Sequence, residues 1–129
     1  MNNKDYYIEN GIIENYNLEF PYGRGDEYIA NSLIIKLEGW GTQSFIITTD
    51  LLSTEKFKKN IKKVLRVEKW KDIINTPIKI IYKKDPEYGS YIIGIGYFLA
   101  KNTELCDVIN SDNVNNDDWF LPYPNLEED

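Results

Sequence analysis

The segment with the clearest binding chemistry is a run in which a tryptophan stands between two glycines, Gly39-Trp40-Gly41-Thr42-Gln43-Ser44-Phe45. An indole can stack on a nucleobase, and the Gln43 amide can hydrogen-bond to a base or sugar edge. The pattern therefore indicates a nucleobase or sugar site around Trp40 and Gln43. The alternative is a tight turn whose indole only covers the core or an oligomer contact, and both interpretations stay open.

A second candidate is Lys101-Asn102, which follows a strand that carries Gly94 and Gly96. A lysine can meet a phosphate as a point charge, and an asparagine can read a base or ribose edge. The alternative is a strand end with a solvated lysine, where Asn102 caps a short helix. Two glycines on one strand face predict close packing of something there, such as the helix, a ligand or another subunit.

The residues for catalysis by the common routes are missing. The chain has no histidine and a single cysteine, Cys106. Ser-His-Asp and Cys-His catalysis are excluded, as are an intrachain disulfide and a thiolate metal site within one chain. We therefore expect a binding protein rather than an enzyme, with no cofactor and no metal.

Charge is distributed unevenly along the chain. The net charge is −6, yet residues 53–84 carry eleven basic and three acidic side chains, a net +8, and residues 104–129 carry eight acids and no base. The acidic tail can balance the basic segment within or between subunits, or the basic segment can attract an anion such as a nucleotide phosphate. With only two arginines, Arg24 and Arg66, a nucleic-acid duplex is not an expected partner.

The pattern of strands and helices that must position these groups predicts an α+β fold. We expect a mostly antiparallel β-sheet with one main amphipathic helix, a short second helix and a docked C-terminal tail. Residues 1–129 are expected to form a single domain, with 111–129 a partly flexible acidic and aromatic tail. No secretory signal and no run long enough to span a bilayer is visible, so we expect a cytoplasmic protein without a membrane partner. The predicted strands are 11–20, 28–37, 42–49, 78–82 and 90–99, and the predicted helices are about 54–66 and 67–74.

The 54–66 helix has the strongest local signal. Ser53 or Thr54 can cap it, and its apolar residues recur on one face, at Phe57, Ile61, Val64 and Leu65. Because that face must pack on the sheet, the lysines and Arg66 form a basic outer face.

In order along the chain, several of these pieces resemble a family of small phage and prophage proteins. The pieces are Leu37–Phe45, then Val67-Glu68-Lys69-Trp70-Lys71-Asp72-Ile73, then Ile95-Gly96, Lys101-Asn102 and Asp118-Trp119-Phe120-Leu121-Pro122. Together they span about residues 8–122. The chain departs from the family pattern in four places. Phe45-Ile46-Ile47-Thr48 replaces a small-residue F-G-G-Y run, and Tyr97 replaces a histidine. Lysines replace most helix arginines, and 103–117 reads as an insertion.

The family includes anti-Thoeris sponges, which sequester a cyclic ADP-ribose signal of bacterial immunity without cleaving it and assemble as homo-oligomers. The resemblance implies a phage-encoded anti-defence protein of this kind in the bacterial host cytoplasm, for cyclic or glycocyclic ADP-ribose. The ligand-binding residues expected on this basis are Trp40, Gln43, Phe45, Lys58, Lys62, Arg66, Tyr97, Lys101, Asn102 and Trp119.

The acidic C-terminal tail favours a different function. Eight acids without a base over 104–129 are typical of a segment that mimics nucleic acid. The alternative is therefore a protein-binding inhibitor, either an anti-CRISPR or an immunity protein.

Overall fold

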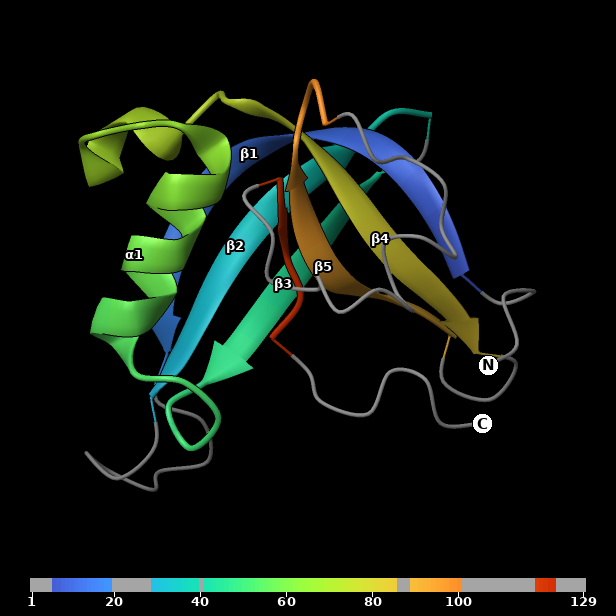
Figure 1. Ribbon diagram of the computed structural model, residues 1–129. Coiled ribbons are helices and arrows are strands. Elements are labelled where there is room, and N and C mark those ends of the chain that lie inside the picture. Colours follow the sequence, from blue (N-terminus) through green and yellow to red (C-terminus); the bar gives the residue numbers. More distant parts are fainter. Residues whose placement is uncertain (1–5, 20–28, 40, 86–88, 101–117, 123–129) are drawn as a thin grey trace.

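The computed structural model describes residues 6–19, 29–39, 41–85, 89–100 and 118–122. Within them, six strands form one curved antiparallel sheet in the order β3-β2-β1-β4-β5-β6 (Figure 1). This confirms the predicted α+β class with a mostly antiparallel sheet. The strands are β1 (Tyr6–Glu19), β2 (Ala30–Leu37), β3 (Thr42–Thr48), β4 (Pro77–Asp85), β5 (Gly89–Tyr97) and β6 (Trp119–Phe120).

Strand β1 joins the two hairpins of the sheet. Its first half pairs with β4 and its second half with β2, and Gly11 pairs with both, opposite Ile78 and Leu37. A Cβ on Gly11 would lie 2.9 Å from Ile35 Cγ2, so glycine permits the close approach of β2. The strand begins five residues earlier than the sequence predicts, because 6–10 form a ladder with the distant β4.

The predicted hairpin over 28–49 is confirmed as β2 and β3. The connecting turn needs glycine at two positions. Gly39 and Gly41 have φ of 88° and 60°, values at which the backbone of most other residues is strained. The backbone N–H of Leu37 donates to the Gly41 carbonyl across 2.9 Å.

Helix α1 (Thr54–Leu65) begins where the sequence predicts, and it lies across one face of the sheet (Figure 1). Ser53 is the N-cap, since its side chain accepts a hydrogen bond from the backbone N–H of Lys56. The predicted apolar face is buried: Phe57 and Ile61 are fully inaccessible to solvent. The helix ends at Arg66, which adopts the left-handed conformation with φ of 57°.

The second predicted helix, 67–74, is shorter than expected. Only Trp70–Ile73 form one 3-10 turn, η4, because the left-handed Arg66 ends the helical path on one side and extended Ile74 precedes β4 on the other. Ile73 is nonetheless fully buried.

Strand β6 contributes to both faces of the sheet. Phe120 packs in the main core between the sheet and α1, with ring centroids 6.2 Å from Phe45 and 6.3 Å from Phe57. Trp119 and Leu121 pack on the opposite face in a smaller cluster with Tyr6, Ile81 and Ile93. The predicted docking of the C-terminal aromatic peptide is thereby confirmed for residues 118–122.

The glycines of β5 make room for this docking. A Cβ on Gly96 would lie 2.4 Å from the Trp119 ring, and one on Gly94 would lie 2.2 Å from Leu121 Cδ2. The predicted close packing on the two glycines is therefore made by the chain's own C-terminal segment.

Candidate functional site

The residues expected from the sequence to bind a ligand do not gather in one place. Trp40, Lys101 and Asn102 lie outside the described residues. Phe45 is fully buried against Phe57 and Phe120 and has no surface for a ligand. Its neighbour Gln43 is half-buried on β3, opposite Ile35 of β2.

Lys58 is engaged with the aromatic edge of the main core. Its Nζ lies 5.4 Å from the ring centroids of both Tyr16 and Trp70, whose rings meet edge to face at 4.8 Å. Such cation–π contacts are worth about 0.5–1 kcal/mol at exposed sites. Lys58 therefore has a structural role, and Lys62 one turn later is half-buried.

A buried polar chain lies beneath this cluster. The Tyr16 hydroxyl donates to Asn31 Oδ1, and Asn31 Nδ2 donates to Thr54 Oγ1 across 3.1 Å. Asn31 is fully inaccessible, and burial raises the pKa of Tyr16. Both the oxygen and the nitrogen of the Asn31 amide therefore have hydrogen-bond partners. These two hydrogen bonds hold the start of α1 against β1 and β2.

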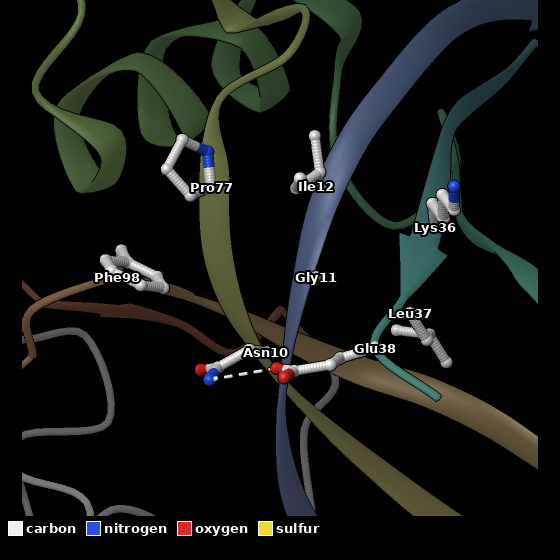
Figure 2. Close-up of a pocket in the computed structure, with 8 residues that line it drawn as sticks. All are labelled: Asn10, Gly11, Ile12, Lys36, Leu37, Glu38, Pro77 and Phe98. Carbon is white, nitrogen blue, oxygen red and sulfur yellow. Dashed lines mark hydrogen bonds between the residues drawn. The ribbon is translucent and has the colours of Figure 1, made fainter. Parts of the chain in front are cut away.

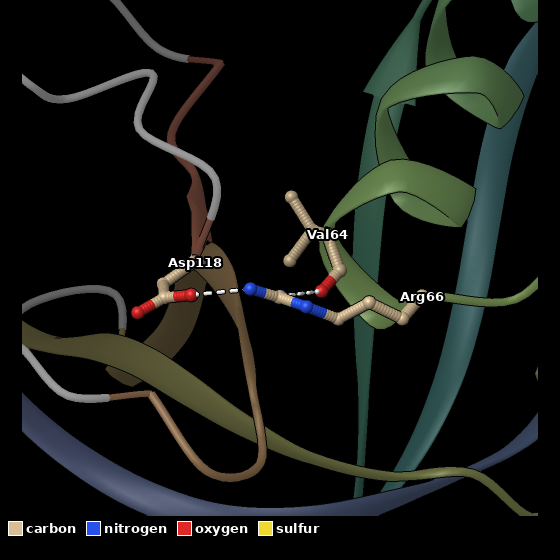
Figure 3. Close-up of polar contacts among 3 residues, drawn as sticks. All are labelled: Val64, Arg66 and Asp118. Atoms are coloured by element: carbon tan, nitrogen blue, oxygen red, sulfur yellow. Dashed lines mark hydrogen bonds and ion pairs between the residues drawn. The ribbon is translucent and has the colours of Figure 1, made fainter.

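Arg66 meets Asp118 at the other end of α1 (Figure 3). The Arg66 guanidinium stacks over the Tyr97 ring, with Cζ 3.8 Å from the centroid. It also donates across 2.7 Å to the Val64 carbonyl and across 2.7 Å to Asp118 Oδ1. Trp119, next to Asp118, is only 1% exposed. Arg66 therefore links the end of α1 to the residue that precedes β6.

A pocket of about 480 Å³ lies elsewhere, over β1 at the point where β1 passes from β4 to β2. Figure 2 shows Pro77 and Phe98 on one side of β1 and Lys36 and Leu37 on the other. Ile13 and Ile35 belong to the core under α1, so their neighbours Ile12 and Lys36 point to the opposite sheet face. The pocket is lined by Asn10, Gly11, Ile12, Lys36, Leu37, Glu38, Pro77 and Phe98.

The pocket combines apolar walls with a short polar chain. Ile12 is 43% and Phe98 38% exposed, which leaves apolar surface for a ligand. The Lys79 ammonium donates to Asn10 Oδ1 across 3.1 Å and lies 5.7 Å from the Phe98 centroid. Asn10 Nδ2 in turn donates to Glu38 Oε2 across 3.4 Å. Convergent polar groups on a partly apolar pocket are typical of small-molecule sites.

Tyrosines and lysines also meet at the far end of β1 and β4. The Tyr7 ring stacks on Tyr82 at 5.3 Å, and Lys84 Nζ lies 4.8 Å from the Tyr7 centroid. Burial, followed by Glu9 and Tyr7, raises the pKa of Tyr82. These are cross-strand contacts between neighbouring strands.

Sequence reasoning missed the pocket residues Asn10, Lys36 and Phe98, and Lys79, which contacts two of them. Glu38 belongs to the family-like run but was given no binding role. The only local signal is the alternation of Asn10 and Ile12 with buried neighbours. It identifies no site until the pairing of β1 with both β2 and β4 is known.

The turn that contains Trp40 directly follows the pocket residue Glu38. Over the described ranges, no three potential metal-ligating side chains gather in one place, and no helix is long and apolar enough to cross a membrane. Comparison with protein-family models, curated proteins and solved structures gives no match.

Proposed function

We propose that this protein is a phage-encoded anti-defence sponge, which binds a cyclic ADP-ribose-type nucleotide in the host cytoplasm and releases it uncleaved. The observation that carries the proposal is the pocket over β1. It is lined by the residues that lead into the Gly39-Trp40-Gly41 turn, the segment on which both the nucleobase interpretation and the family resemblance depend.

The pocket suits such a ligand in size and chemistry. Its volume of about 480 Å³ falls within the range of small-molecule sites. Phe98 and Ile12 offer apolar surface to a base, while Lys36 and Lys79 supply positive charge for a diphosphate. Sequestration needs affinity without chemistry, and a chain without histidine is consistent with that requirement.

The direct test is calorimetry and thermal shift with cyclic ADP-ribose and glycocyclic ADP-ribose, each at about 100 µM, because a ligand that binds the folded state raises the melting temperature. The complex is then heated, and the released nucleotide is identified by chromatography. We expect a rise in melting temperature and recovery of intact ligand. Absence of any shift, or recovery of a cleaved product, contradicts the proposal.

Paired lysine variants locate the site. Lys36→Ala removes a charge at the pocket, whereas Lys59→Ala removes an exposed charge from α1, on the other face of the sheet. We expect the first to weaken binding severalfold and the second to leave it unchanged. Equal effects of the two variants would place the ligand away from the pocket.

We also propose that the protein assembles as a homo-oligomer with its ligand site near a subunit contact. Ile12, at the pocket, and Ile46, on the same sheet face, are each 43% exposed. Exposed apolar residues on one face favour association. Light scattering tests this directly, and a monodisperse monomer would contradict it.

A further inference from the structure

Two opposite charges flank the amide of the pocket residue Asn10. Lys79 Nζ donates to its oxygen across 3.1 Å. Its nitrogen donates to Glu38 Oε2 across 3.4 Å (Figure 2). Because the amide accepts on one side and donates on the other, its orientation is fixed by both partners. Lys79 contacts the lining residues Asn10 and Phe98, so positive charge lies beside the pocket at this end, whereas Glu38 lines the pocket on the other side of Asn10. Lys36 is the lysine among the lining residues.

Both ends keep capacity for a ligand. An ammonium group has three donors, and Asn10 accepts from one of those of Lys79. The Glu38 carboxylate is solvent-exposed and can only accept hydrogen bonds. A simple anion is attracted by the first group and repelled by the second. A matched ligand carries an anionic group at one end and a hydrogen-bond donor at the other.

We infer that this pocket distinguishes nucleotides by their base, with Glu38 accepting a hydrogen bond from the exocyclic amino group of adenine and Lys79 meeting a phosphate. This inference rests on the proposed function and adds base specificity to it. Ile12, Pro77 and Phe98 line the same pocket and offer apolar surface to the base.

The test compares cyclic ADP-ribose with cyclic inosine diphosphate ribose, in which the amino nitrogen on the six-membered ring is replaced by a carbonyl oxygen. The carbonyl would face the carboxylate acceptor to acceptor. A hydrogen bond to a charged group is worth roughly a tenfold difference in affinity. We expect calorimetry to give wild-type protein about tenfold tighter binding of the adenine ligand.

Two near-isosteric variants test the roles of Glu38 and Lys79 separately. Glu38→Gln replaces the carboxylate by an amide that can both donate and accept a hydrogen bond. The ratio of the affinities for the adenine and inosine ligands is therefore expected to fall to about one. Lys79→Met is expected to weaken both ligands about tenfold, to keep the preference, and to reduce the salt dependence of binding. Melting of the unliganded variants verifies that each remains folded, and Lys59→Met serves as the matched control.

The outcomes separate the two proposals. If wild-type protein binds neither nucleotide, the proposed function fails and the base specificity fails with it. If it binds both equally, or if Glu38→Gln retains the preference, only the role of Glu38 is overturned and sequestration stands. If Lys79→Met binds as tightly as wild type, the phosphate end is overturned.

Discussion

Alanine at Gly96 should destabilise the fold by forcing β6 away from β5. The added Cβ would lie 2.4 Å from Cε3 and Cζ3 and 2.8 Å from Cδ2 of Trp119. The indole cannot rotate away easily, because it is rigid and only 1% exposed. The backbone is held as well, since the Tyr97 N–H donates to the Asp118 carbonyl across 2.8 Å.

The magnitude follows from the two ways in which the protein can respond. Accommodating an extra methyl in a packed core costs about 1–3 kcal/mol. Detaching β6 instead exposes Trp119, Phe120 and Leu121, and each buried large apolar side chain contributes about 1.5–3 kcal/mol. The first response is cheaper, so we expect the free energy of unfolding to fall by about 2–3 kcal/mol.

The assay is urea denaturation followed by circular dichroism, with a double-mutant cycle as the control. Trp119→Leu alone leaves a cavity and destabilises the protein, but it also removes the ring that the new methyl would meet. Gly96→Ala should therefore cost much less in the Trp119→Leu background than in wild type. A Gly96→Ala protein within about 0.5 kcal/mol of wild type, or strictly additive effects, would refute the docking described for Trp119.

Three further predictions concern the polar contacts. Tyr16→Phe leaves the fully buried Asn31 without one donor and should lower the free energy of unfolding by about 1–2 kcal/mol in urea denaturation; unchanged stability would contradict the buried chain. Burial raises the pKa of Tyr16 above 10.0, so its contribution is complete below that pH and is lost as pH rises through the folded-state pKa; thermal melts at rising alkaline pH should show a smaller loss for Tyr16→Phe, and parallel curves would contradict this. Arg66→Ala loses the contacts to Asp118 and Tyr97 while keeping the left-handed φ of 57°, so Arg66→Gly should be the more stable of the two variants by about 1 kcal/mol in urea; the reverse order would show that the backbone is unstrained there.

Local signals in the sequence are sufficient to predict most of the helices and strands. The apolar spacing of Phe57 and Ile61, with Ser53 ahead of them, identifies α1 almost to the residue. The glycines around Trp40 and the β-branched residues of 42–49 identify the hairpin. The second helix was overestimated because nothing local indicates that Arg66 turns left-handed and ends the helical path.

The charged side chains expected to bind a ligand show the limit of that approach. Arg66 was identified by its charge, yet its guanidinium is held by Tyr97, Val64 and Asp118. Lys58 similarly lies against two aromatic rings. Composition shows that a segment is basic, but only tertiary contacts show which of its cations already have a partner.

The pocket depends on strand register, which a sequence does not display. Trp119 pairs with Gly96, Gly96 with Lys79, and Lys79 with Asn10, so one row crosses β6, β5, β4 and β1. A slip of one residue between β1 and β4 would turn one strand's side chains to the other face and separate Lys79 from Asn10. In this row, Gly96, which lies under the Trp119 ring, pairs with Lys79, which bonds to the pocket residue Asn10. The docking of the C-terminal segment and the cationic end of the proposed nucleotide site therefore depend on the same strand pairings.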